Sequence, residues 1–298
     1  MSKPGIAVIG SAMMDLTTYS HMIPEPGQSI IGELFTTGFG GKGANQAVMA
    51  ALCGAKVHFI GSVGRDLFGD SIAENFQKLG IDSDGIQRSN TPTGVAHIWV
   101  NGEGENRIIV IPGSNHEIEI PKAIASLNDI ENLSVVVAQC EIRQNVTLAV
   151  FTAAKARGAI TILNPAPFEA LSDELLAMCD WLIPNETEFK SLTDVTPYED
   201  ENLTGFRSGK NSIVTLGAQG AVVISADGSI SRIPAPKVSV VDTTGAGDAF
   251  VGSFAYGLAH AMTPVTALKL GIRVASMSVS KKGAQSSYPT QAEIAMLS

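Results

Sequence analysis

The sequence predicts an α/β fold, in which a doubly wound, mainly parallel sheet is flanked by helices and carries a small β-sheet lid. Short continuous apolar runs rich in β-branched residues alternate with helical stretches, and two segments interrupt this alternation. Continuous apolar runs are typical of strands buried on both faces of a parallel sheet. With 45% hydrophobic and 16% charged residues among 298, the chain can bury a large core.

The expected elements follow in chain order. Each apolar run is three to five residues long, which suits a buried strand. The stretches between the runs are long enough for helices. The expected strands are residues 6–9, 56–60, 134–138, 160–163, 181–183, 212–216 and 221–224. The expected helices include residues 44–52, 69–79 and 144–157.

The two interruptions, residues 15–37 and 94–111, read as strands without helices between them. In the second, residues 95–100 and 106–110 flank Asn101-Gly102-Glu103-Gly104-Glu105, which predicts a hairpin with glycines in its loop. We expect these segments to form a discontinuous β lid on one domain that spans residues 1–298, since no repeat or Pro/Gly/Ser-rich linker divides the chain.

Charge and composition exclude several function classes. The net charge of −9 argues against binding to nucleic acid or to an anionic membrane. No apolar run approaches the roughly 20 residues that a membrane span needs, and no signal-peptide segment precedes the first strand. Three sparse cysteines indicate buried free thiols, and five scattered histidines show no metal-ligand spacing. We therefore expect a cytoplasmic enzyme.

The segment Val240-Val241-Asp242-Thr243-Thr244-Gly245-Ala246-Gly247-Asp248 predicts a strand, a glycine turn and a helix. Phe250, Phe254 and Leu258 would share one face of that helix. Free N–H groups at a helix start bind anions, and Gly245 and Gly247 let a ligand approach the backbone. Asp248 would stand beside the anion, where a carboxylate can accept a proton from an attacking hydroxyl. The alternative is that Asp248 simply favours a helix start.

A second glycine-rich segment is Gly38-Phe39-Gly40-Gly41-Lys42-Gly43-Ala44-Asn45-Gln46-Ala47. It satisfies the dinucleotide pattern G-x-G-x-x-G, but it does not follow the first strand, and Ile60-Gly61-Ser62 offers no acidic residue about 20 positions on. It is not a Walker A loop, because Gly43 follows Lys42. A glycine turn that presents Lys42 and Asn45 suits the hydroxyls of a polyol. Taken singly, Lys42 could be a surface lysine.

These two segments resemble the diagnostic motifs of the ribokinase/PfkB carbohydrate kinases. The resemblance extends over the chain and takes in residues 164–167, 184–188, 215–217 and 283–287. The full Gly-Gly-Lys-Gly-Ala-Asn-Gln form, with Asn-Pro-Ala-Pro and Gly-Ala-Gln-Ser, is typical of the ribokinases. The resemblance implies transfer of a phosphoryl group from ATP to the primary (5-) hydroxyl of a pentose, D-ribose in the first place, with Mg²⁺ and K⁺ as cofactors.

The resemblance also implies roles for matching positions. The base would be Asp248, with the N–H groups of Gly245, Ala246 and Gly247 as an anion hole. The sugar would be held by Asp15, Gly41, Lys42, Asn45, Glu141 and Asp248. Mg²⁺ and ATP would be held by Asn185, Glu188, Thr215, Gly217, Gly220 and Gly247. The monovalent cation would lie among Asp242, Thr244, Ser278, Lys281, Gly283 and Ser287. Asn185 and Glu188 alone could instead be a helix cap and a solvated charge, and Glu141 an ordinary strand-end carboxylate.

One position departs from the family pattern. Bacterial ribokinases typically have Gly-Ser-x-Asn-x-Asp after the first strand, whereas this chain has Gly10-Ser11-Ala12-Met13-Met14-Asp15. A thioether cannot replace an amide in binding a hydroxyl, so Met13 predicts weak selection at the 2-position of the sugar. The alternatives are a 2-deoxyribose kinase, another PfkB sugar or nucleoside kinase, and a sugar-binding regulator without turnover. The resemblance further implies a homodimer formed through the lid, which the apolar residues 98–100 would suit.

Overall fold

The computed structural model describes residues 3–206 and 209–297, and within them the strands form two sheets. The larger sheet has nine strands in the order β13-β12-β11-β10-β9-β8-β1-β4-β5. The strands from β11 to β5 run parallel, whereas β12 and β13 form an antiparallel edge. Their bounds are β1 (Gly5–Ile9), β4 (Lys56–Gly64), β5 (Asp82–Ser89), β8 (Leu133–Gln139), β9 (Ile160–Asn164), β10 (Trp181–Leu182), β11 (Asn211–Thr215), β12 (Ala221–Ile224) and β13 (Ile230–Ile233).

The order of these strands confirms a doubly wound sheet. From β1 the chain moves outward to β4 and β5, then returns to β8 on the other side of β1 and continues through β9 and β10 to β11. The direction of winding therefore reverses between β1 and β8. In open α/β sheets, ligands bind beyond the carboxyl ends of the strands at this reversal.

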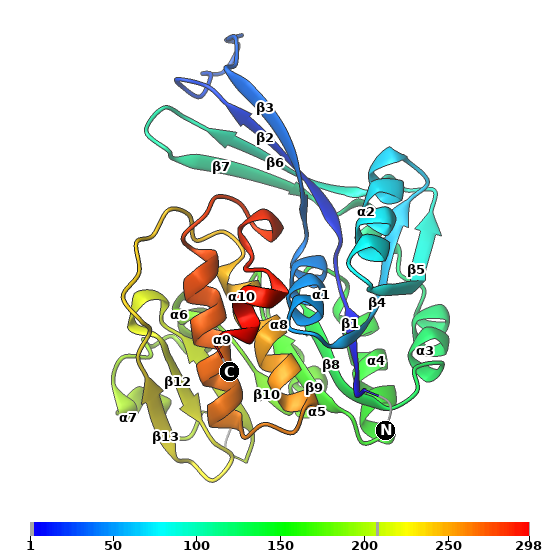
Figure 1. Cartoon of the computed structure of the whole chain (residues 1–298), viewed down its shortest axis with the longest axis vertical. Helices are drawn as coiled ribbons and strands as arrows, with labels where there is room; N and C mark the ends of the chain where they lie inside the picture. Colours follow the sequence, from blue (N-terminus) through cyan, green and yellow to red (C-terminus); the bar gives the residue numbers. More distant parts are fainter. Residues whose placement is uncertain (1–2, 207–208, 298) are drawn as a thin grey trace.

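Helices cover both faces of this sheet (Figure 1), because alternate side chains of its strands point to opposite cores. Ile6 and Val8 join one core, and Ala7 and Ile9 join the other. The first core is covered by α1 (Lys42–Leu52), α2 (Leu67–Lys78), α8 (Ala246–Ala259), α9 (Pro264–Ser278) and α10 (Gln291–Ala295). The second is covered by α3 (Ile120–Asn128), α4 (Gln144–Ala156) and α5 (Asp173–Met178), while α6 (Glu186–Thr193) and α7 (Asp200–Leu203) pack near β11 and β12.

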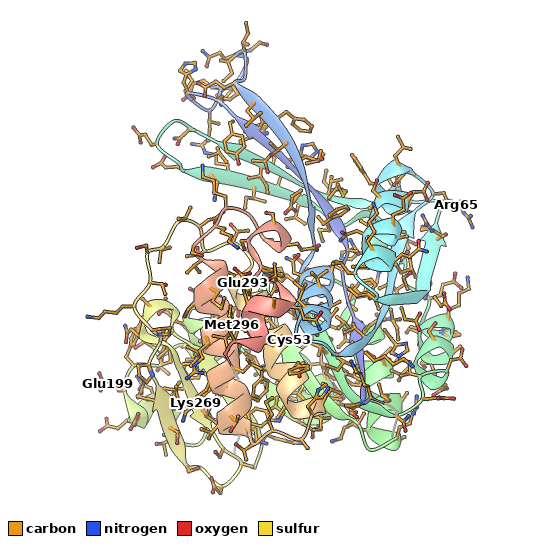
Figure 2. All side chains as sticks on the ribbon, in the orientation of Figure 1. Cys53, Arg65, Glu199, Lys269, Glu293 and Met296 are labelled. Atoms are coloured by element: carbon orange, nitrogen blue, oxygen red, sulfur yellow. The ribbon has the colours of Figure 1, made fainter. Side chains whose placement is uncertain are left out.

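Helices α1 and α8 cross at close range, and a glycine makes this possible. A Cβ atom on Gly252 would lie 2.5 Å from the carbonyl oxygen of Gln46 and 2.9 Å from Cβ of Met49. Phe254 packs α8 against the sheet through an edge contact with Trp181 of β10 at a centroid distance of 5.1 Å, and its ring is stacked with that of Phe250 at 6.2 Å. The crossing places the start of α8 beside α1. The three buried cysteines, including Cys53 at the end of α1 beside α10 (Figure 2), are free.

The smaller sheet has the order β3-β2-β6-β7 and projects from the body of the molecule (Figure 1). Its strands are β2 (Met13–Tyr19), β3 (Leu34–Gly40), β6 (Gly94–Val100) and β7 (Asn106–Ile111). The strands predicted for the two interruptions are thus confirmed, as is the hairpin around residues 101–105, where β6 pairs with β7. Every residue of β7 is exposed.

The strand expected at Val240-Val241 is wrong. Residues 236–240 have no regular structure, and the Val240 and Val241 side chains are 59% and 55% exposed. The segment is instead anchored by the Val279 carbonyl, which accepts hydrogen bonds from Val241 N at 2.8 Å and from Asp242 N at 3.2 Å. Two edge strands, β5 and β13, were not expected, because their exposed positions carry polar residues. Three 3₁₀ turns complete the described chain: η1 (Gly113–Glu117), η2 (Gly217–Gln219) and η3 (Gln285–Ser287). None of the helices in this part of the chain has the length and apolar character to cross a membrane.

Candidate active site

The carboxylate of Asp248 lies at the centre of the candidate site, in the first turn of α8. Its side chain is buried, and each of its oxygens accepts one hydrogen bond from α1. Asn45 Nδ2 donates to Oδ2 at 3.0 Å, and Gln46 Nε2 donates to Oδ1 at 2.9 Å. The close crossing of α1 and α8 therefore fixes the direction of the Asp248 carboxylate.

Further amides surround Asn45 and Gln46. Gln46 Nε2 also donates to Asn164 Oδ1 at 3.1 Å, Gln139 Nε2 donates to Gln46 Oε1 at 2.6 Å, and Gln285 Nε2 donates to Asn45 Oδ1 at 3.0 Å. The sequence assigned no role to Gln46, Gln139, Asn164 or Gln285. Gln46, Asn164 and Gln285 belong to the segments that carry the resemblance, and this could have indicated a role for them. Gln139 lies outside those segments, so nothing in the sequence singled it out.

At the start of α8, Ala246 N donates to the Thr243 carbonyl at 3.2 Å, and the first N–H groups of a helix have no partner within the helix itself. Gly245, the residue that precedes the helix, has φ = 76°, a left-handed conformation that favours glycine. No atom lies within 4 Å of the position that a Cβ on Gly247 would take, so this glycine faces open space. That space is a cavity of about 180 Å³. Its lining includes Lys42, Asn185, Glu188, Thr215, Gly245 and Gly247 together with Asp248.

Lys42 is the cation at this cavity, and three carboxyl groups lie near it. Burial opposes the charge on Lys42, but the carboxylates of Asp248, Glu141 and Glu188 outweigh it and raise the pKa of the lysine. Burial raises the pKa of Glu141 and of Glu188. Glu141 Oε2 accepts hydrogen bonds from Ser11 Oγ and, at 2.9 Å, from Lys42 N. The Lys42 ammonium is thus a charged group with three carboxylates around it, positioned to meet an anion.

Asp15 lies on β2 and lines a second cavity, of about 620 Å³, with residues of β3 and of the segment 282–290. Burial, followed by repulsion from Glu141 and Asp248, raises the pKa of Asp15 to about 6. A Cβ on Gly40 would lie 2.2 Å from Asp15 Oδ1, so a side chain at position 40 would displace this carboxyl. Gly41 also has a positive φ, of 86°, where the chain passes from β3 to α1.

Asn185 and Glu188 form a capping box at the start of α6. Asn185 Oδ1 accepts from Glu188 N and Glu188 Oε2 accepts from Asn185 N, each at 2.8 Å. The alternative that Asn185 caps a helix is therefore confirmed. Glu188, however, is buried rather than solvated, and both side chains line the smaller cavity. Only Oε2 of Glu188 takes part in the cap.

The three residues expected around the nucleotide lie at the end of β11 and in the turn after it. Thr215 lines the smaller cavity and pairs with Asn185 in an isolated bridge. Gly217 and Gly220 lie outside that lining. Gly220 has φ = 96°, and a Cβ there would lie 2.0 Å from the Ile233 carbonyl oxygen, so packing against β13 accounts for this glycine.

The residues expected around a monovalent cation lie in two adjoining segments. Asp242 Oδ1 accepts from Thr244 N at 2.9 Å, and Oδ2 accepts from Gly283 N at 2.8 Å. These hydrogen bonds outweigh the effect of burial and lower the pKa of Asp242. Ser278 O accepts from Lys281 N at 3.4 Å, and Ser287 Oγ donates to Ala284 O at 2.8 Å. No cluster of three His, Cys, Asp or Glu side chains suited to a metal occurs in residues 3–206 and 209–297.

Met13 pairs with Gly40 and Gly94 in the smaller sheet. Its side chain is 2% exposed and lines neither cavity. It precedes Asp15 by two residues on the same strand, so both side chains leave the same face of β2. Met13 is therefore buried next to the larger cavity without lining it.

Residues 3–291 match the family model of the pfkB family carbohydrate kinases. The chain is 36% identical over 293 residues to a deoxyribokinase of Salmonella typhi, covering 96% of this chain and 95% of that protein. It is 38% identical over 292 residues to a ribokinase of Lactococcus lactis, with 97% and 95% covered. A ribokinase of Arabidopsis thaliana, solved with ribose and ATP, superposes with a TM-score of 0.90 at 29% identity, covering 100% of this chain and 99% of that one. The chain therefore belongs to the pfkB family of carbohydrate kinases.

Proposed function

We propose that this kinase transfers the γ-phosphoryl group of ATP to the 5-hydroxyl of D-ribose, giving D-ribose 5-phosphate and ADP. The observation that supports the proposal is the place of Asp248, between Asn45 on α1 and the N-terminus of α8. A polyol held beside Asn45 would offer a hydroxyl to the carboxylate, and an anion at the helix start would lie next to it.

In this proposal the sugar lies among Asp15, Gly41, Lys42, Asn45 and Glu141. The donors and acceptors of these residues match the hydroxyls of a pentose. Asp248 accepts the proton of the attacking hydroxyl while the oxygen of that hydroxyl bonds to the γ-phosphorus. The bond between that phosphorus and the bridging oxygen of ADP breaks in the same step.

The phosphoryl group would lie at the start of α8. The N–H groups of Gly245, Ala246 and Gly247, with the positive end of the helix dipole, stabilise the charge on its oxygens. Lys42 adds a cation from the side of α1, since its neighbouring carboxylates keep it charged. The small sheet would serve as a lid that excludes water, so that the γ-phosphoryl group reaches the sugar rather than water.

The residues at the smaller cavity fit a magnesium ion. Mg²⁺ prefers oxygen ligands and keeps several of its waters. Glu188 is a buried carboxylate with one oxygen outside the capping box, and Asn185 lies next to it at the rim. These two residues would hold the ion through its waters. When bound, Mg²⁺ would neutralise charge on the phosphates of ATP.

The residues near Asp242 fit a monovalent cation. Three hydrogen bonds tie Asp242 to Thr244 and Gly283, so the segment before α8 and the segment after α9 lie together with their backbone carbonyls. Oxygen donors of this kind suit a hard cation such as K⁺. When bound there, the cation would lower the negative potential next to the start of α8.

Ribose and 2-deoxyribose differ at the 2-position, where Met13 offers no hydrogen-bonding amide. The similarity to a deoxyribokinase supports 2-deoxyribose as a second candidate substrate. ADP release measured with MgATP and K⁺ on D-ribose, 2-deoxyribose, fructose and adenosine tests both candidates. Turnover on ribose supports the first, and at least a thousandfold preference for ribose would contradict weak selection at the 2-position. Binding of ribose without ADP release would point to a sugar-binding regulator.

A homodimer through the lid is part of the proposal. Strand β7 exposes a run of apolar side chains, of which Ile108 and Ile109 are 53% and 56% exposed, and Trp99 on β6 is 37% exposed. Apolar patches on an edge strand are typical of contact surfaces. A second copy of the same sheet would cover them.

A further inference from the structure

Two obligatory acceptors fix the orientation of the Gln46 amide. A carboxylate only accepts hydrogen bonds, so the Gln46 atom 2.9 Å from Asp248 Oδ1 is the nitrogen Nε2. A backbone carbonyl also only accepts, so the Asn164 atom 2.8 Å from the Ile183 oxygen is Nδ2, which turns Asn164 Oδ1 towards Gln46. Both ends of the chain of amides therefore require Gln46 to direct its NH₂ group away from Gln139.

The orientation of Gln139 follows from that of Gln46. Gln46 Oε1 faces Gln139, which must then donate through Nε2, and the distance is 2.6 Å. This leaves Gln139 Oε1 buried without a hydrogen-bond partner in the described chain. Gln46 and Gln139 are 0% and 1% exposed, so water does not compete with these bonds. An unpaired buried acceptor destabilises the fold. Gln139 leaves its Oε1 unpaired because its Nε2 must face Gln46 and donate to Gln46 Oε1.

We propose that Gln46 is a positioning residue for Asp248 and that Gln139, which does not bond to Asp248, acts through it. The inference rests on the proposed function, in which Asp248 is the base. Gln46 restrains Oδ1 while Asn45 restrains Oδ2, so the carboxylate cannot rotate about its Cβ–Cγ bond. Gln139 restrains the Gln46 amide against rotation by 180°. A base held in one orientation meets the attacking hydroxyl in the reactive geometry.

The substitution Gln139→Glu tests this chain at a distance from the reacting atoms. A carboxylate at 139 accepts instead of donating, so it would compete with Asp248 for the NH₂ group of Gln46. We expect kcat to fall by roughly tenfold to a hundredfold, with the KM for the sugar changed by less than about threefold. Gln139→Met, which lacks both donor and acceptor, is the second variant if the buried carboxylate prevents folding; its kcat should fall in the same direction.

The matched control is Gln87→Glu. Gln87 on β5 also uses its amide twice, donating to the Glu119 carbonyl at 3.1 Å and accepting from Glu119 N at 2.8 Å, but it lies on the far edge of the sheet. Its kcat should equal that of the unsubstituted enzyme. If Gln139→Glu and Gln139→Met both keep kcat within twofold of that value, the inference is wrong.

A pH profile separates positioning from a merely structural effect. Gln46→Glu places a second carboxyl against Asp248, and like charges disfavour ionisation. The acidic limb of kcat should therefore move to higher pH in Gln46→Glu and stay in place in Gln87→Glu. A limb that stays in place in both variants contradicts the role of Gln46.

The side-chain amide resonances of Gln46 test the same contacts without turnover. They should shift in Asp248→Asn and in Gln139→Glu, and stay unchanged in Gln87→Glu. If the unsubstituted protein phosphorylates no sugar, the proposed function fails, and these resonances still decide whether Gln139 orients Gln46 and Gln46 contacts Asp248. Unchanged resonances in both variants would overturn the inference.

Discussion

Asn45 Nδ2 and Asp248 Oδ2 lie 3.0 Å apart, although 203 positions separate the two residues in the sequence. Gly252 brings them together, because a larger residue there would push α8 away from Gln46 and Met49. A residue proposed to hold the sugar and the proposed base are therefore parts of one hydrogen-bonded unit. Changes on either helix should alter catalysis through the other.

Asp248→Asn should abolish most turnover. An amide cannot accept the proton of the attacking hydroxyl, and a general base contributes about 10²–10⁴-fold, so we expect a loss of about 10³-fold in kcat. Binding of the sugar, measured by calorimetry, should be kept because the other residues proposed to hold the sugar are unchanged. Asp129→Asn, at an exposed position after α3, is the control. Turnover within tenfold of the unsubstituted enzyme would refute the assignment of the base.

Gly247→Ala should stabilise the fold and impair the enzyme. No atom meets the added methyl group, and alanine favours a helix over glycine by up to about 1 kcal/mol. The methyl group would occupy the cavity at the start of α8, so kcat/KM for ATP should fall by at least about tenfold.

Gly245→Ala offers a contrast to Gly247→Ala. Its φ of 76° and the 3.0 Å approach to Ala284 should lower the free energy of unfolding, by about 1–2 kcal/mol from the backbone alone. Thermal denaturation and ATP kinetics on both variants separate the two effects.

Asp15 should make stability depend on pH between about 4 and 6. Its pKa is about 6 in the folded protein and near 3.8 in the unfolded chain, so the folded state holds the proton more tightly. The contribution of Asp15 is most favourable below pH 4 and falls as the pH rises towards 6. Asp15→Asn should therefore increase the free energy of unfolding at pH 7.5, by about 3 kcal/mol, with a smaller gain at pH 5. It should also weaken sugar binding. Denaturant titrations at both pH values check the sign, and a loss of stability at pH 7.5 would contradict it.

The sequence predicted the parallel strands and the small sheet because each has a local signal, either a continuous β-branched run or a glycine hairpin. It misplaced a strand at Val240-Val241, since an apolar pair alone does not show whether a neighbouring strand is there to pair with it. It also brought Asn45 and Asp248 into one proposed site only through the resemblance. The amides of Gln139 and Asn164 could not be assigned, because their partners lie on other elements and their orientations depend on the whole chain of hydrogen bonds.

Met13→Asn should increase the preference for ribose over 2-deoxyribose. An amide at this position can bond to a 2-hydroxyl that the thioether leaves unpaired, and one such bond is worth about 1.5 kcal/mol, or roughly tenfold. The ratio of kcat/KM for the two sugars measures the change. Met49→Asn is unsuitable as a control because Met49 is fully buried in the core. Met14→Leu, one position from Met13 along β2, is the better control, and its ratio should equal that of the unsubstituted enzyme. If Met13→Asn leaves this kcat/KM ratio unchanged, residue 13 does not contribute to selection at the 2-position of the sugar.

The apolar run on β7 should hold two copies of the chain together. Successive side chains of a strand point to opposite faces, so Ile108→Glu with Ile109→Glu places a charge on both faces of β7. Buried in an apolar contact, such charges are costly, and the double variant should sediment as a monomer at micromolar concentrations at which the unsubstituted protein is a dimer. Leu67→Glu, at an 83% exposed position on α2, should leave the dimer intact. If the unsubstituted protein is itself a monomer at these concentrations, the lid does not pair two subunits and must cover the sugar without a partner.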